Sequence, residues 1–187
     1  MGQLEKLGLI VAVMALVVAA LLPASFQLFP PSASDLSGRQ SCVSYSEHGP
    51  ASVLSYSANC PLPELSSTQI LVKAEFASLN PCDFKFRRLS LPYPSVTVPV
   101  LDFLFPKPKI PALDVSGTVV GVGPSVRRFA VGDRVAATQP IVHTRWGTLA
   151  QFAAVEEAHA ARLPGGVQPR DAAAVSLVGL TTVQAFE

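Results

Sequence analysis

Histidine and cysteine are the side chains most able to hold a metal ion or act as a nucleophile, and the chain has three of each. No histidine has a second ligand at the spacing that metal sites need, so a solvated side chain is the preferred interpretation. The cysteines are too few and too scattered for a Cys-x-x-Cys site. The sequence therefore predicts no metal site at any of them: His48, His143, His159, Cys42, Cys60 and Cys82.

Cys42 and Cys60 flank a predicted hairpin and could meet across it to form a disulfide. Such a bridge would require an oxidising compartment. Two free structural thiols are the interpretation that we favour.

The segment Gly121-Val122-Gly123-Pro124-Ser125-Val126 is the nearest match to a dinucleotide-binding loop. That loop needs a glycine-rich turn between a strand and a helix, so that a pyrophosphate meets backbone N–H groups at the helix N-terminus. Val126 stands where the third glycine would be, and no helical pattern follows it. The sequence predicts a β-turn here, and a Rossmann domain that is absent from the chain.

The elements that would position any site are mostly strands. Val115–Val122 is apolar and β-branched, and Gly132-Asp133 signals a tight turn before the extended run Val135–Ala137. With 187 residues and 49% hydrophobic content, the chain is expected to form one mainly β domain with short helices. Further strands are predicted at Cys42–Tyr45, Val53–Tyr56, Gln69–Leu79, Thr148–Val155 and Ala160–Pro164, and helices at Pro169–Ser176 and Gly179–Phe186.

The charge is balanced, with a formal net charge of +1. No basic stripe with interleaved aromatic residues is present, so the sequence gives no footprint for nucleic acid.

The N-terminus carries an uninterrupted apolar run, Leu7–Leu22. At helical rise this run spans about 24 Å, between a signal-peptide core and a full bilayer crossing. We interpret residues 1–29 as an N-terminal hydrophobic helix that serves as an anchor or signal-anchor, and residues 30–41 as a linker rich in Pro and Ser. The chain is thus expected to be membrane-associated through residues 7–22, in an organelle that the sequence leaves open. A cleaved signal peptide is the alternative.

Residues 89–111 form a proline-dense apolar segment in which neither a regular helix nor a central strand is expected. The favoured interpretation is an insertion packed on its own domain, or a gene-model error that translated non-coding sequence. A lid or membrane-skimming loop that exposes Phe103 and Phe105 is the functional alternative.

Four segments, in this order, resemble the motifs of medium-chain dehydrogenase/reductases in their zinc-independent quinone oxidoreductase (zeta-crystallin-like) branch. The resemblance implies a GroES-like partly open β-barrel over residues 42–176, with residues 177–187 as the start of a truncated interdomain helix. The motifs are Ala77-Ser78-Leu79-Asn80-Pro81-Cys82-Asp83, the stretch from Asp114 to Val135, Gly147-Thr148-Leu149-Ala150-Gln151-Phe152, and Asp171-Ala172-Ala173-Ala174 followed by Gly179-Leu180-Thr181-Thr182.

Against the zinc-dependent relatives of this fold, two ligand positions are changed. Asn80 occupies the position of a cysteine ligand, and Leu113 occupies that of the histidine in a Gly-His-Glu triplet. Without the thiolate and the imidazole, a catalytic zinc cannot be held in that geometry. The four-cysteine structural lobe is absent as well.

The resemblance also implies roles for four residues near an NADPH nicotinamide. Asn80 is expected to be a positioning amide close to the cofactor, Lys85 a polar donor to substrate or cofactor, and Asp83 mainly structural. Thr181 resembles a threonine that lies near the cofactor. Taken alone, Asn80-Pro81 reads as a turn and Thr181 as a helix-surface hydroxyl.

The expected function is the substrate-side domain of an NADPH-dependent oxidoreductase that reduces quinones or enones (α,β-unsaturated carbonyl compounds) by hydride transfer, inactive when truncated. One alternative is a stand-alone GroES-like module that binds a partner or a hydrophobic ligand. A further alternative is the enoyl-reductase part of a larger synthase.

Overall fold

The computed structural model describes residues 38–88, 108–140 and 146–187. The predicted anchor (residues 1–29), residues 30–37 of the predicted linker (30–41) and residues 89–107 of the proline-rich segment (89–111) lie outside them, whereas the end of the predicted linker is the start of β1. Among the described residues, no helix combines the length and the apolar character that crossing a bilayer would require. The membrane association predicted for residues 7–22 therefore stays a prediction.

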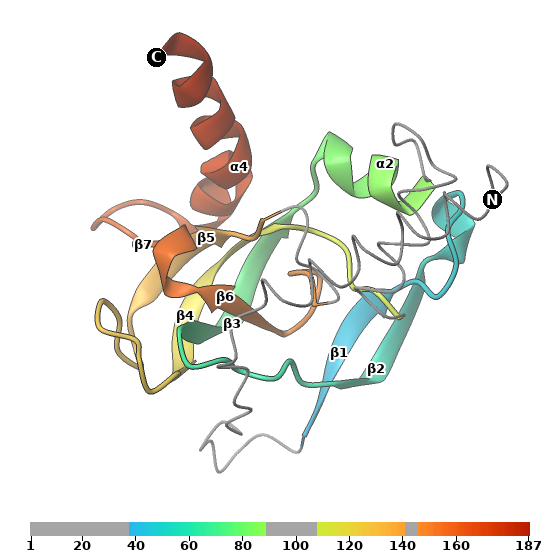
Figure 1. Ribbon diagram of the computed structural model, residues 1–187, viewed down its shortest axis with the longest axis horizontal. Helices are drawn as coiled ribbons and strands as arrows, with labels where there is room; N and C mark the ends of the chain where they lie inside the picture. The colour runs from blue at the N-terminus through green and yellow to red at the C-terminus, as the bar shows by residue number, and fades with distance from the viewer. Residues whose placement is uncertain (1–37, 89–107, 141–145) are drawn as a thin grey trace, which may run out of the picture.

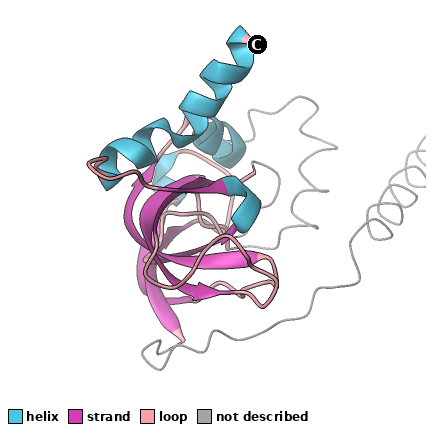
Figure 2. Cartoon of the chain, turned by 90° about the vertical axis from the view of Figure 1, so that its left-hand side faces the viewer, coloured by secondary structure: helices cyan, strands magenta, loops and turns pink. Residues whose placement is uncertain are grey.

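A five-stranded antiparallel sheet, ordered β6-β3-β4-β5-β7, forms the body of the fold (Figure 1). A separate two-stranded sheet pairs β1 with β2, and the strands curve around a common interior (Figure 2). This is the mainly β architecture that the sequence predicts. The strands are β1 (Arg39–Ser44), β2 (Ser55–Pro61), β3 (Gln69–Ser78), β4 (Asp114–Val122), β5 (Arg134–Thr138), β6 (Phe152–Glu156) and β7 (Ala160–Arg162).

Two helices, α2 (Pro81–Arg88) and α4 (Pro169–Phe186), rise from the same side of the strands (Figures 1 and 2). Short 3-10 turns, η1 (Ala51–Val53) and η2 (Glu157–His159), complete the described elements. Helix α4 packs on β3, β4 and β5 through its first turns.

The main core lies between the central strands and their neighbours. Ile70, Val72 and Val115 are completely buried, because β3 and β4 are flanked by other strands. Burying one such side chain stabilises a fold by about 1.5–3 kcal/mol. The core also contains Val119, Val126, Phe129, Val135, Ala137, Ala153, Val155 and Ala160.

Several strand boundaries differ from the sequence prediction, among them the starts of β2 and β6. Strand β2 begins at Ser55, and residues 51–53 form the turn η1. Strand β6 begins at Phe152 instead of Thr148, because the backbone N–H groups of residues 147–149 bond to the carbonyls of residues 110–112. Lys109 and Ile110, at the end of the predicted insertion, are buried and bridged to Tyr45 and Trp146.

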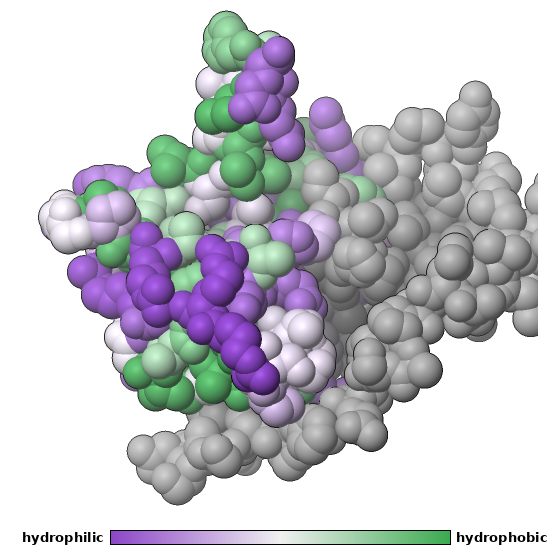
Figure 3. Space-filling view, turned by 60° about the vertical axis from the view of Figure 1, so that its left-hand side comes forward, coloured by the Kyte–Doolittle hydropathy of each residue, from purple (hydrophilic) through white to green (hydrophobic). Residues whose placement is uncertain are grey.

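The two C-terminal helices predicted at Pro169–Ser176 and Gly179–Phe186 are one continuous helix, α4. Glycine within a helix costs only about 1 kcal/mol relative to alanine, so Gly179 does not end it. Apolar side chains are exposed along α4: Val175, Val178, Leu180, Val183 and Phe186 (Figure 3).

The expectation that Cys42 and Cys60 are free thiols is wrong. The two residues form a disulfide between β1 and β2, with their Cα atoms 6.0 Å apart. The register explains it, because Cys60 pairs with Gln40, only two residues before Cys42 on β1; an irregularity with one extra residue on β2 follows between these positions. Cys82 is free, and both disulfide cysteines are buried against Ile110.

The predicted turn before β5 is confirmed at Gly132-Asp133. Gly132 adopts a φ of 97°, which a residue with a side chain rarely tolerates. The Asp133 carboxylate accepts hydrogen bonds from the Ala130 N–H at 2.9 Å and from the Arg162 guanidinium at 2.8 and 3.2 Å. Arg162 therefore ties β7 to the turn that starts β5.

The Asp133–Arg162 contact predicts a pH-dependent contribution to stability. The hydrogen bond from Arg162, followed by that from Ala130, lowers the pKa of Asp133 below its ordinary value. The ionised carboxylate therefore stabilises the fold above about pH 4, and this is lost as the pH falls through the folded-state pKa. We expect Asp133→Asn to lower the urea midpoint at pH 7, and its deficit to shrink towards about pH 2. A deficit that is constant with pH, or an equal response in the exposed control Glu47→Gln, would contradict this.

Candidate functional site

The candidate site lies where β3 ends, α2 begins and β4 begins. In the β3–β4 register, the last residue of β3, Ser78, pairs with the first residue of β4, Asp114. Asn80 lies two residues after the end of β3, and its Nδ2 donates a buried hydrogen bond to Asp114 Oδ2 at 2.9 Å. The Ser78 hydroxyl donates to the same oxygen at 2.9 Å. Antiparallel pairing therefore brings Asp114 to two polar residues, Ser78 and Asn80, that lie more than 30 residues earlier in the sequence.

Asp114 is fully buried and firmly placed. Its backbone carbonyl accepts a hydrogen bond from the Thr148 hydroxyl at 2.8 Å. Its Oδ1 is buried and has no hydrogen-bond partner among the described residues. Leaving a buried carboxylate oxygen unpaired costs free energy, so packing alone does not account for this side chain.

Asp83 holds the backbone on both sides of this pair. One of its oxygens accepts from the Asn80 N–H at 2.7 Å, and the other from the Ala112 N–H at 3.1 Å. Ala112 has a φ of 73°, a left-handed conformation that is strained for alanine. Burial raises the pKa of Asp83, although these two N–H groups oppose the shift. The geometry gives Asp83 the task of fixing the loop that leads to Asp114.

The other two predicted site residues lie elsewhere. Lys85 is exposed on α2, less than two turns beyond Asn80. Thr181 lies in the exposed part of α4, and its hydroxyl donates to the Leu177 carbonyl at 2.9 Å instead of to Asn80 or Asp114. The structure thus joins Asn80 and Asp83 directly, places Lys85 on the same short helix, and does not bond Thr181 to them.

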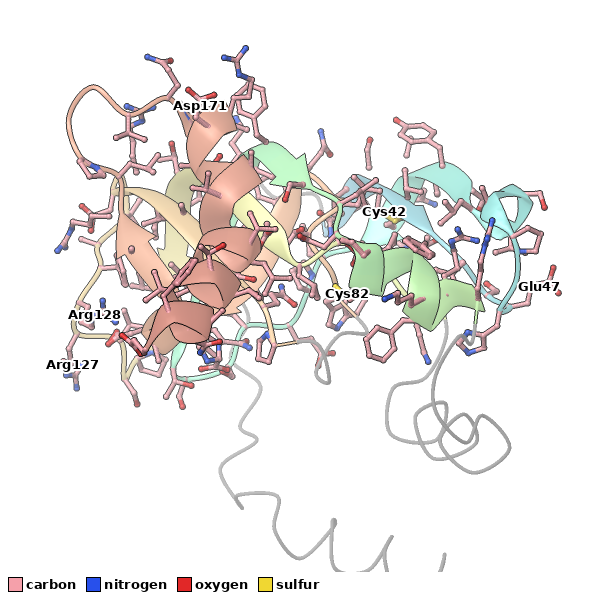
Figure 4. The ribbon with its side chains drawn as sticks, turned by 90° about the horizontal axis from the view of Figure 1, so that it is seen from above. Cys42, Glu47, Cys82, Arg127, Arg128 and Asp171 are labelled. Atoms are coloured by element: carbon pink, nitrogen blue, oxygen red, sulfur yellow. A yellow bond between two sulfur atoms is a disulfide. The ribbon has the colours of Figure 1, made fainter. Side chains whose placement is uncertain are left out.

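Figure 4 shows the arrangement from above. Cys82 lies on α2, whereas Arg127 and Arg128 lie at the far end of the molecule from that helix. Burial, and then the neighbouring Asp83 carboxylate, raise the pKa of the Cys82 thiol, so it is less readily ionised than an ordinary cysteine. A group of three or more His, Cys, Asp or Glu side chains fit to hold a metal does not occur in the described part of the chain.

Two members of the site, Ser78 and Asp114, are missing from the predicted site residues. Asp114 directly follows Leu113, and the resemblance assigns it no role. A signal for it exists: an aspartate that opens an apolar, β-branched run has to be buried with the strand, and a buried carboxylate needs donors. The partner donors could not be identified, because they depend on the β3–β4 register.

Comparison with known proteins identifies the family to which the chain belongs. Residues 66–165 match the family described as Alcohol dehydrogenase GroES-like domain. The chain is 35% identical over 144 residues to the chloroplast envelope quinone oxidoreductase homolog of Arabidopsis thaliana. The chain belongs to the medium-chain dehydrogenase/reductase superfamily, in its quinone oxidoreductase-like branch.

Two further relatives agree with this placement of the dehydrogenase/reductase chain. It is 33% identical over 137 residues to the NADPH-dependent alkenal/one oxidoreductase, chloroplastic, of Arabidopsis thaliana, covering 71% of this chain and 33% of that protein. It superposes on the quinone oxidoreductase of Coxiella burnetii with a TM-score of 0.68 and 26% identity, covering 78% of this chain and 44% of that chain. For the envelope homolog the shares are 77% and 41%, so the chain spans about two fifths of these relatives.

The GroES-like fold that the resemblance implies is therefore confirmed. Asn80 and Leu113, the two positions that the resemblance assigns to zinc ligands, are linked through Asp114. Asn80 is hydrogen-bonded to Asp114, the residue next to Leu113, and Leu113 is buried with its carbonyl bonded to the Gln139 N–H. An amide and an aliphatic side chain thus stand where a thiolate and an imidazole would be needed for zinc.

A nicotinamide nucleotide fits part of this domain. Asn80 is 8% exposed; its nitrogen is bonded to Asp114, and its Oδ1 makes no hydrogen bond within the described residues. That oxygen can accept from a ribose hydroxyl or a carboxamide N–H. A glycine-rich strand–turn–helix, which a pyrophosphate would need, is not found in the described ranges. The residues fit the nicotinamide end of the cofactor and leave the phosphates to other sequence.

Proposed function

We propose that this chain is the substrate-side domain of an NADPH-dependent oxidoreductase that reduces quinones or α,β-unsaturated carbonyl compounds without zinc. The observation that carries the proposal is the buried Asn80–Asp114 pair beside Leu113, which takes the place of a zinc-ligand set. The names of the relatives, which include a quinone oxidoreductase homolog and an NADPH-dependent alkenal/one oxidoreductase, support the same reaction class.

The surroundings of Asn80 suit an apolar, conjugated acceptor. Leu79, next to Asn80, is exposed, as are Phe84 on α2 and Phe76 on β3. Small-molecule sites in proteins are lined mostly by apolar and aromatic side chains, with a few polar groups that fix orientation. Exposed apolar side chains on the elements that flank Asn80 are consistent with binding a quinone ring or an enone.

The proposed chemistry relies on hydrogen bonds in place of a Lewis acid. NADPH, when bound, supplies the hydride that conjugate reduction needs. Asn80 would hold the nicotinamide end through Oδ1, and Lys85 would donate a hydrogen bond to the acceptor carbonyl oxygen, where negative charge develops. The Thr181 hydroxyl donates to the Leu177 carbonyl. It can therefore accept a hydrogen bond from the cofactor as it stands, but it can donate one only after it leaves that carbonyl.

A nicotinamide-oxidation assay tests the proposal on the full-length product that contains a cofactor domain. We expect NADPH oxidation that depends on added quinone or alkenal, and no turnover by the 187-residue chain alone. Absence of turnover with every acceptor tried would count against the enzyme and favour the stand-alone binding module.

Two variants on the same exposed helix make the assay specific. Lys85→Met is expected to lower kcat/KM for the acceptor by about tenfold or more, because a donor to developing charge is lost. Arg88→Met removes a positive charge from another exposed position of α2 and is expected to change the rate little. Equal losses in both variants would indicate a general charge effect and would remove Lys85 from the site.

A further inference from the structure

We propose that Asp114 is a positioning residue: its carboxylate fixes the Asn80 amide with the nitrogen inward and the carbonyl oxygen outward. Asp114 Oδ2 accepts from both Asn80 Nδ2 and the Ser78 hydroxyl, each at 2.9 Å. A carboxylate oxygen can only accept, so the amide atom that faces it must be the nitrogen. The orientation of Asn80 therefore follows from the chemistry of its partner.

The way in which α2 begins supports this role. A residue in the position of Asn80 usually turns its side-chain oxygen back to cap the helix that follows. Here the Asn80 backbone accepts from the Asp83 N–H at 3.0 Å, and the Asp83 carboxylate accepts from the Asn80 N–H at 2.7 Å. The Asp83 N–H is thus bonded without the Asn80 side chain, which reaches across to β4 instead.

Asp114 is suited to hold another group still. It is fully buried, it faces Ser78 through the β3–β4 register, and its carbonyl is bonded to Thr148. Its Oδ1 remains unpaired, which a purely structural residue would not require. One carboxylate oxygen, Oδ1, is thus left without a partner, while the other, Oδ2, holds the Asn80 amide.

The consequence concerns which ligand groups Asn80 can recognise. With the nitrogen bonded inward, the outward oxygen accepts hydrogen bonds, so Asn80 selects a donor such as a ribose hydroxyl or a carboxamide N–H. This last step rests on the proposed function, whereas the orientation of the amide does not. Polarising the acceptor carbonyl falls to another group.

Side-chain amide NMR on the ¹⁵N-labelled 187-residue chain tests the orientation without turnover. The Asn80 resonances are identified by their loss in Asn80→Ala. We expect Asp114→Val, which lacks an acceptor, to speed exchange of these amide protons by about tenfold or more. Asp114→Asn keeps an oxygen at the Oδ2 position and is expected to preserve slow exchange, as is Ser78→Ala. Unchanged exchange in Asp114→Val would overturn the proposal.

A second variant keeps the proposal testable should Asp114→Val fail to fold. Asn80→Asp places two carboxyl groups in hydrogen-bond contact, and one of them must hold a proton. Its melting temperature is expected to fall steeply as the pH rises to neutrality, unlike the wild type. Adding Asp114→Asn should abolish that dependence. A pH profile of Asn80→Asp that matches the wild type would contradict contact between the two side chains.

Kinetics on the full-length enzyme separate the two proposals. If Asp114 positions Asn80 for the cofactor, Asp114→Val should raise KM for NADPH by about tenfold while kcat changes less, and Asp114→Asn should restore it. If Asp114→Val loses slow amide exchange, but neither the full-length wild type nor its variants oxidise NADPH, the positioning role is upheld and the proposed function is refuted. If Asp114→Val turns over with the same KM for NADPH as the wild type, the proposal that the Asn80 oxygen accepts a hydrogen bond from the cofactor is refuted.

Discussion

Replacing Gly147 with alanine is expected to destabilise the domain by about 3 kcal/mol, the upper end of the cost of overpacking. Gly147 is buried, and a Cβ atom at this position would clash with the backbone carbonyl oxygens of Ile110, Pro111 and Ala112. Those carbonyls accept the hydrogen bonds of residues 147–149, at 3.0 to 3.1 Å. Backbone cannot move aside as a flexible side chain can, so both segments must separate.

Thermal and urea unfolding measure this effect. A loss of about 3 kcal/mol should lower the melting temperature by about 6–12 °C in a domain of this size. Gly165→Ala is the matched control, because a Cβ atom there meets nothing within 4 Å. The segment displaced by Gly147→Ala leads into Asp114, so the Asn80 amide should also lose its protection from exchange. Equal melting temperatures for the two variants would refute the close approach.

Loss of the Cys42–Cys60 disulfide is expected to cost about 3 kcal/mol, the value for a loop of this length. The two cysteines are 18 residues apart in sequence, and the bridge restricts the unfolded chain as it holds β1 to β2. Cys42→Ser and Cys60→Ser should therefore melt well below the wild type under oxidising conditions.

Reductant provides the internal check on this prediction. It should lower the wild-type midpoint to that of the two serine variants and leave those variants unchanged. Cys82→Ser removes the free thiol and should alter the free energy of unfolding by less than about 0.5 kcal/mol. A wild-type midpoint that is indifferent to reductant would mean that the thiols are unpaired in solution.

The strands could be predicted from the sequence because local composition determines them. A few neighbouring residues are enough to predict the β-branched strand β4 and the glycine turn before β5. Helix α2 was missed, although Asn80, Pro81 and Asp83 are a helix-start pattern: a capping residue, a proline in the first turn and an acid near the N-terminus. The dipeptide Asn80-Pro81 is also common in turns, and the sequence names no residue that packs against it, so a turn is the prediction from sequence alone.

What could not be predicted depends on register. The register of β1 on β2 decides whether Cys42 meets Cys60, and the pairing of Ser78 with Asp114 decides which donors surround the buried carboxylate. Both follow from tertiary packing, which no local pattern encodes. Asn80 and Asp83 were found through the motif that they share with relatives, and the reason for their proximity became visible only in the fold.

The order of strands in the main sheet has a consequence for synthesis. Strand β3 is sealed on one side by β6, although about 74 residues separate the end of one from the start of the other. At a ribosomal rate of about 5–20 residues per second, the β3 edge waits about 4–15 s for its neighbour. Ile70, Leu71 and Val72 are exposed on the nascent chain during this interval, with backbone groups free to pair. Crowded polysomes should therefore favour edge-to-edge association of emerging copies, and early chaperone binding to this strand should suppress it.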